Sequence, residues 1–163
     1  MPWPVALVLD ILLTPLVLCA MPWVRWRQAA ILREGAALTH EQVQLARSVG
    51  VMAAERVRVM TAHVIPLPIP QFARNVAQRV GWTSAHIAGM TLGHGIVLRA
   101  DCGADLRLLA HELAHVGQVE RLGGIAGFLR QYLRECVWPG YPHGALEAEA
   151  RAAEERVLSM QRM

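Results

Sequence analysis

The segment from Leu106 to Arg121 constrains the fold of this 163-residue chain most strongly. Its apolar residues recur at helical spacing, which predicts an amphipathic helix with one face in a core. Asp105, directly before the segment, is a favourable N-cap, and Gly123 and Gly124 act as stop signals after it. Any fold of the chain must therefore bury one side of a helix of about four turns.

Two histidines within this helix, His111 and His115, are four residues apart. This spacing puts both imidazoles on one face, one turn apart, where they can reach the same metal ion. Glu112 flanks that face, from which a carboxylate can act as a base on a metal-bound water. A catalytic zinc generally has three protein ligands and one open position. The pattern therefore predicts a Zn²⁺ site with Glu112 as general base and a third ligand elsewhere in the chain.

The third ligand is expected in the last helix, predicted over residues 145–160. Glu147 stands near its start, directly after a loop rich in proline and glycine, and Glu149 is the competing candidate. Glu154 and Glu155 are interpreted as part of a solvated helix face. The residues alone leave the choice between Glu147 and Glu149 open.

The loop before Glu147 holds further candidates for the chemistry. The oxyanion that develops in acyl transfer usually needs a hydrogen-bond donor. Tyr141 and His143 are the expected donors, and Arg151 is a more distant candidate. His143 is also considered as a metal ligand, since imidazole binds zinc.

The segment His111-Glu-Leu-Ala-His115, followed further along by Glu147-Ala-Glu-Ala150, resembles the gluzincin clan of zinc metallopeptidases, and most of all its minimal single-domain members. The resemblance covers residues 87–160. It implies that Glu147 is the third ligand, that Glu112 is the general base and that a peptide or protein is the substrate. Arg151 departs from the clan pattern, because many relatives have there an aspartate that supports a zinc-bound histidine.

Local patterns predict an α+β fold that is mostly helical, with a small antiparallel sheet or hairpin before the active-site helix, and the resemblance implies that this fold is zincin-like. The hairpin is expected over Ile87–Arg99, with its turn at the glycines around His94, which is expected to be an exposed turn residue. A strand is predicted over residues 55–60. Further helices are predicted over residues 39–48, 71–80 and 125–137.

The N-terminal segment, residues 3–24, is apolar throughout except for Asp10. About 20 such residues suffice to cross a bilayer, so membrane association through this segment is expected. The arginines that follow, beginning at Arg25, would keep the rest of the chain on the cytoplasmic side. The alternative is a helix bent at Pro15 that is buried in the domain or lies along the membrane interface. The expected division is an N-terminal segment over 1–35 and a metallopeptidase domain over 36–163.

The composition fits this division. The chain is 54% hydrophobic and 18% charged, against roughly 25% charged residues in typical soluble domains. The arginines are scattered, so no nucleic-acid partner is expected.

Two other functions remain open: a non-catalytic zinc-binding structural or regulatory domain, and a membrane-associated protein that acts through a partner. Glu112 and the absence of a cysteine near the histidines favour catalysis, because structural zinc sites are usually closed by cysteine.

Overall fold

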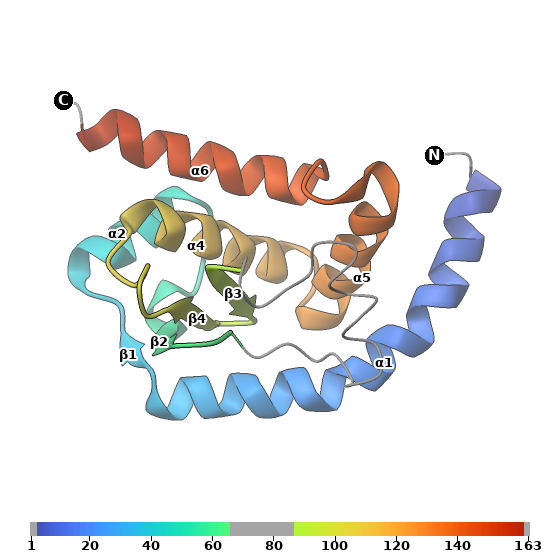
Figure 1. The fold of residues 1–163 in the computed structure, drawn as a ribbon, viewed down its shortest axis with the longest axis horizontal. Coiled ribbons are helices and arrows are strands. Elements are labelled where there is room, and N and C mark those ends of the chain that lie inside the picture. Colours follow the sequence, from blue (N-terminus) through green and yellow to red (C-terminus); the bar gives the residue numbers. More distant parts are fainter. Residues whose placement is uncertain (1–2, 66–86, 162–163) are drawn as a thin grey trace.

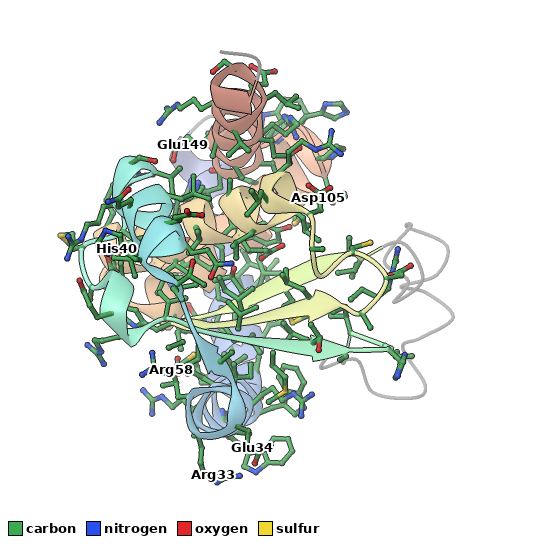
Figure 2. All side chains as sticks on the ribbon, turned by 90° about the vertical axis from the view of Figure 1, so that its left-hand side faces the viewer. Arg33, Glu34, His40, Arg58, Asp105 and Glu149 are labelled. Atoms are coloured by element: carbon green, nitrogen blue, oxygen red, sulfur yellow. The ribbon has the colours of Figure 1, made fainter. Side chains whose placement is uncertain are left out.

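The computed structural model describes residues 3–65 and 87–161. The elements stack in layers: α6 (Ala145–Gln161) lies on α4 (Leu106–Arg121), α4 covers a small sheet, and α1 (Trp3–Glu34) runs beneath the sheet (Figure 1). Figure 2 shows the same order from the side, with Arg33 and Glu34 of α1 below the strands. The remaining helical elements are α2 (His40–Ser48), η1 (Ala54–Arg56), α5 (Ile125–Glu135) and η3 (Cys136–Gly140).

The sheet has four strands in the order β1-β2-β4-β3. These are β1 (Ala36–Ala37), β2 (Arg58–Ala62), β3 (Gly89–Leu92) and β4 (Gly95–Arg99). The antiparallel hairpin of β3 and β4 is confirmed. The hairpin joins the rest of the sheet through its second strand, β4, which pairs with β2 in parallel. The sheet is therefore mixed. The α+β class is confirmed, and β3 lies at the edge of the sheet.

Strand β4 is covered on both faces, as its alternating side chains dictate. Ile96 and Leu98 point to one side, into a core that includes Leu113 of α4. Val97 points to the other side, where it shares a cluster with Ile31 of α1. Because successive strand residues face opposite ways, one short strand joins both layers. The C-terminal half of α1 therefore contributes to the core of the domain that follows it.

Short side chains bring α4 and α6 together. Ala110 and Ala114 of α4 pack against Ala150, Ala153 and Val157 of α6. These residues recur three or four positions apart on each helix, so they form two facing stripes. Alanine lets the two helix backbones approach closely, which brings polar side chains of α6 within reach of the histidines of α4.

Most predicted helix boundaries agree with the structure. The helix predicted over 39–48 is α2, and Thr39 and Gln42 form a capping box at its start. Asp105 caps α4, because its side chain accepts a hydrogen bond from the main-chain N–H of Arg107 at 2.9 Å. The helix predicted over 125–137 is α-helical to Glu135 and then continues as the π turn of η3. The helix predicted over 71–80 lies outside the described residues.

Two local expectations near the sheet are corrected. The strand predicted over 55–60 begins at Arg58, because residues 54–56 form the 3₁₀ turn η1. His94, expected to be an exposed turn residue, is largely buried and its Nε2 lies 2.8 Å from Oε1 of Glu120. Alternation of polar and apolar residues does not distinguish a strand from a short turn that leads into one.

Helix α1 is long and apolar enough to cross a membrane by length and composition. One side of it packs against the protein, with Leu13, Val17 and Met21 buried. Asp10, the one charge in the apolar run, forms an ion pair with Arg134 of α5. The helix is therefore attached to the domain along much of its length.

Candidate metal centre

Three side chains from two helices converge: His111 and His115 of α4 and Glu147 of α6. The two Nε2 atoms lie 3.1 Å apart. Glu147 Oε2 lies 3.5 Å from Nε2 of His111, and its Oε1 lies 3.6 Å from Nε2 of His115. A tetrahedral zinc with bonds of about 2.0–2.2 Å separates its ligand atoms by about 3.3–3.6 Å. The two separations that involve Glu147 fall within or at the edge of this range and the nitrogen–nitrogen separation is slightly shorter, so the cluster could hold a metal ion.

Gln118 fixes the orientation of the His115 ring. Its Nε2 donates to the main-chain oxygen of Leu146 at 2.9 Å and to Oε2 of Glu149 at 3.0 Å. Its Oε1 therefore faces His115 Nδ1, 2.7 Å away. An amide oxygen only accepts, so His115 Nδ1 carries the proton. When the ring is neutral, the Nε2 lone pair points into the cluster.

Glu154 fixes the orientation of the His111 ring in the same way. Its Oε1 lies 2.6 Å from His111 Nδ1, and an ionised carboxylate only accepts hydrogen bonds. His111 Nδ1 is then the donor, and Nε2 is left with a lone pair. A carboxylate or amide partner on the far nitrogen is the usual support of a metal-binding histidine.

The result is a group of electron-rich atoms that face one another. Two neutral imidazoles in these tautomers cannot form a hydrogen bond across the 3.1 Å between their Nε2 atoms, and the Glu147 carboxylate adds negative charge. Only a cation, whether a proton or a metal ion, relieves this arrangement. Two imidazole nitrogens and one carboxylate are also a donor set that suits zinc and leaves one position open.

The charges around the cluster favour a bound cation. Burial works against ionisation of Glu147, but hydrogen bonds with His115 and Tyr132 outweigh it and lower the pKa of Glu147. Burial likewise opposes protonation of His115, yet the interactions with Glu147 and Glu112 raise the pKa of His115. The site therefore holds a carboxylate and attracts positive charge.

Tyr132 of α5 forms one wall of the site, which the sequence did not indicate. Its hydroxyl donates to Oε1 of Glu147 at 2.8 Å. Burial raises the pKa of Tyr132, and the charge of Glu147 raises it further, so the phenol stays a neutral donor. Phe128, one turn earlier, stacks edge-on against the His115 ring with centroids 5.6 Å apart. The four-residue spacing of Phe128 and Tyr132 was the feature of the sequence that indicated that both lie on one face of this helix.

Glu112 is buried beside the cluster but outside the trio of ligands. The Thr91 hydroxyl of β3 lies 2.6 Å from Oε2 of Glu112 and 2.9 Å from its main-chain oxygen. Gly89, two residues earlier on the same face of β3, leaves room for the carboxylate, because a Cβ there would lie 2.5 Å from Oε1. Edge strand β3 therefore holds Glu112 in place. The alternation of Gly89 and Thr91 follows the strand period, but nothing in the sequence indicated that these two residues contact Glu112.

The other glutamates of α6 separate into different roles. Glu149 turns away from the histidines to Gln118 and Arg121. It lines a cavity of about 470 Å³ formed by the segment after α2 and by α4 and α6, and Figure 2 labels Glu149 on the upper helix layer. Glu155 is exposed, as expected. The interpretation of Glu154 as solvated was wrong, since it binds His111.

Arg151, the residue that departs from the clan pattern, does not contact the histidines in the described contacts. Arg151 instead donates to the main-chain oxygen of Pro142 at 2.8 Å and so ties the preceding loop to α6. Glu154 stands seven residues after Glu147, which places both on one face two turns apart. The carboxylate that contacts His111 Nδ1 is therefore Glu154, one turn after Arg151 on the same helix.

The loop between η3 and α6 carries Tyr141 and His143, both exposed. Partial burial raises the pKa of Tyr141, and the charges of Glu147 and Glu112 add to this effect. The described contact of His143 is a main-chain hydrogen bond to Gly140 at 2.7 Å. The donor roles of both side chains stay predictions.

Glu135 at the end of α5 fixes the start of α6. Its Oε2 accepts the main-chain N–H of Leu146 at 2.8 Å and so caps the helix. A Cβ on Gly144 would lie 2.4 Å from that oxygen, so glycine admits the carboxylate. This cap sets the position of Glu147, one residue after Leu146.

Residues 69–123 match the model of a family described as the eCIS core domain. The matched segment contains β3, β4, both histidines and Glu112, whereas Glu147 and Glu154 lie beyond it. No curated protein and no solved structure matched the chain. In this segment, a minority of its length, the chain is therefore similar to the eCIS core domain, and that likeness does not by itself indicate an activity.

Proposed function

We propose that the protein is a zinc-dependent metallopeptidase. One observation carries this proposal: the Nε2 atoms of His111 and His115 converge with Glu147 at separations of 3.1 to 3.6 Å, close to those of zinc ligands, while the buried carboxylate of Glu112 lies outside the trio. Zinc is proposed because its preferred donors are imidazole nitrogen and carboxylate oxygen in a four-coordinate site.

In this proposal some residues bind the metal ion and Glu112 takes part in the reaction. His111, His115 and Glu147 would hold the ion, and Glu154, Gln118 and Tyr132 orient them through the contacts above. Bound zinc would lower the pKa of water to about 7 and polarise a carbonyl. Glu112 would accept the proton of the attacking water and return it to the leaving nitrogen.

The proposed substrate is an extended peptide beside β3. Within the described residues, β3 pairs with β4 alone and its outer edge is unpaired. Gly89 and Thr91 of the same strand touch Glu112. A peptide added along this edge would have its main chain hydrogen-bonded and one of its carbonyls close to Glu112 and the metal ligands. Tyr141, on the nearby loop, is the proposed donor to the oxyanion.

Zinc content tests the metal site. We expect near one zinc per chain in the wild type, loss of zinc in His115→Ala and Glu147→Ala, and retention in Glu149→Ala, measured by elemental analysis after purification without chelator. Glu149→Ala tests the competing candidate ligand, because Glu149 lies on the same helix but contacts Gln118 and Arg121 rather than the histidines. A wild type that takes up no zinc when it is offered would refute the proposal.

Glu112→Gln tests catalysis separately from metal binding. This variant keeps the shape of the side chain and should retain zinc, while peptide cleavage falls by about 10²–10⁴-fold. The assay is a peptide library read by mass spectrometry, with wild type and variant side by side. Zinc-loaded wild type that cleaves nothing would instead favour a structural or regulatory zinc domain.

A further inference from the structure

The N-terminal half of α1 presents a continuous apolar surface to solvent. We call it the outer face of α1, and define it as its exposed residues between positions 11 and 22. Leu12 and Leu18 are more than half exposed, at 65% and 64%. The full set is Ile11, Leu12, Pro15, Leu16, Leu18, Cys19 and Pro22. Contiguous exposed apolar surface of this kind marks an interaction site.

The opposite side of the helix is already occupied. Leu13, Val17 and Met21 are buried at intervals of four residues, and Asp10 is ion-paired with Arg134 of α5. A transmembrane arrangement would expose this packed side and carry a half-buried ion pair into lipid, which is unfavourable. The helix in this fold is therefore suited to lie against a surface rather than to cross one.

The shape of α1 agrees with a surface position. Pro15 and Pro22 lie inside the helix and both belong to the outer face. A proline bends a helix away from its own side, because its ring clashes with the carbonyl one turn earlier. The outer face is thus convex, and Figure 1 shows α1 curving around α5 at the edge of the molecule.

Positive charge continues the outer face towards the C-terminus of α1. Arg25, Trp26 and Arg33 are all exposed, and at 3.6 residues per turn they fall on the same side as the apolar set. The sequence has no acidic residue from position 11 to position 33. Basic residues beside an apolar stripe, with a tryptophan at the junction, are the features that bind an anionic lipid surface.

We propose that α1 docks its outer face flat on an anionic phospholipid membrane. The apolar set spans about 17 Å at 1.5 Å per residue, and it would lie at the boundary between headgroups and acyl chains. Trp26 would occupy the headgroup level and Arg25 would contact lipid phosphates. Helix α5 and the metal centre stay on the aqueous side, because they lie against the other side of α1.

Vesicle sedimentation of the full-length protein tests the proposal. We expect binding to vesicles of phosphatidylcholine with phosphatidylglycerol, and binding at least tenfold weaker to phosphatidylcholine alone. Leu12→Glu/Leu16→Glu should abolish sedimentation, whereas Arg25→Gln should weaken it about fivefold and added salt should weaken wild-type binding. Leu106→Glu is the matched control, since Leu106 is a partly exposed leucine at the start of α4. All variants should keep the wild-type zinc content, which separates this test from that of the metal site.

Three results would overturn the proposal. The first is a wild type that does not sediment with anionic vesicles. The second is equal binding to neutral and anionic vesicles, or binding that Leu12→Glu/Leu16→Glu leaves intact. The third is a soluble dimer, seen by analytical ultracentrifugation, that the same double substitution dissociates without any vesicle binding, since the outer face would then join two copies of the chain.

Discussion

Gln118 shows how much a single side chain contributes to the candidate metal centre. It is 2% exposed, and its amide joins His115 to the start of α6 through the main-chain oxygen of Leu146. One residue thus sets the tautomer of a metal ligand and the spacing between the two ligand-bearing helices. Gln118 lies three residues after His115 on the same helix face, and this spacing is the feature of the sequence that indicates a contact between the two side chains.

Glu154 is expected to tune metal affinity without binding the metal. Replacing Glu154 by alanine removes the acceptor of His111 Nδ1, so the ring loses its fixed orientation. We expect zinc affinity to fall about 10–100-fold, as for other supporting residues, measured by competition with a chromophoric chelator. Glu155→Ala, the exposed neighbour, should leave the affinity unchanged. Equal affinities of Glu154→Ala and wild type would show that this carboxylate does not support the site.

Gly89 is expected to control the position of Glu112. A Cβ at this position would lie 2.5 Å from Glu112 Oε1, so Gly89→Ala must displace the carboxylate. Misplacement of a reacting group by about 1 Å can cost 10²-fold in rate, so we expect such a loss in kcat with zinc content unchanged. Gly103→Ala serves as control, since its Cβ would meet the side chain of Thr61 at 3.1 Å, away from the centre. A fully active Gly89→Ala would contradict the role given to Glu112.

At the scale of elements, α4 contacts the sheet, the last helix and the segment after α2. One of its sides packs on β4 through Leu113, and another packs on α6 through Ala110 and Ala114. Its last turn carries Glu120, whose carboxylate accepts hydrogen bonds from the main-chain N–H groups of Met52 and Ala53 at 2.6 and 3.1 Å. The helix therefore fixes the sheet, the last helix and the loop after α2 at once.

Glu120 is expected to make stability depend on pH in the acidic range. Burial alone would raise its pKa, but hydrogen bonds from Met52, His94 and Ala53 lower it below the ordinary value of 4.5. The carboxylate therefore stabilises the fold fully above that value, and this contribution is lost as pH falls through the lower, folded-state pKa. Glu120→Gln should cost about 1–3 kcal/mol at pH 7 and flatten the acid dependence, measured by urea unfolding from pH 3 to pH 7.

The control for this experiment is Glu155→Gln, which removes an exposed carboxylate of α6. It should leave the dependence on pH close to that of the wild type. If Glu120→Gln and Glu155→Gln gave the same curve, the contacts of Glu120 would have no part in the acid sensitivity.

At the scale of the whole molecule, the candidate metal centre connects segments far apart in the chain. The ligands belong to α4 and α6, and Tyr132 of α5 supports Glu147 from a third helix. A ligand that binds the folded state alone stabilises it by mass action. Zinc at about 1,000 times its Kd would add about 4 kcal/mol, or roughly 8–16 °C in Tm for a domain of this size.

Removal of zinc by a chelator should therefore lower Tm by that amount, measured by calorimetry, and added zinc should restore it. His115→Ala should already have the lower Tm, and chelator should not change it further. A chelator effect of the same size in His115→Ala would mean that the metal is bound elsewhere.

The sequence by itself determined much of the helical framework and the pair of histidines in the candidate metal centre. Local rules were sufficient for α2 and α4 with their caps, because a cap and an amphipathic period depend on neighbours within a few residues. The four-residue spacing of His111 and His115 likewise depends on one helix. The hairpin of β3 and β4 was predictable for the same reason.

The tertiary structure decided what lies between elements. The parallel pairing of β2 and β4, the selection of Glu147 over Glu149 in the cluster and the support of His111 by Glu154 all depend on how α6 and the sheet meet α4. These contacts join residues distant in sequence, and no local pattern specifies the rotation of one helix about its axis relative to another. The packing of alanines between α4 and α6 sets that rotation, and with it the glutamate that reaches the histidines.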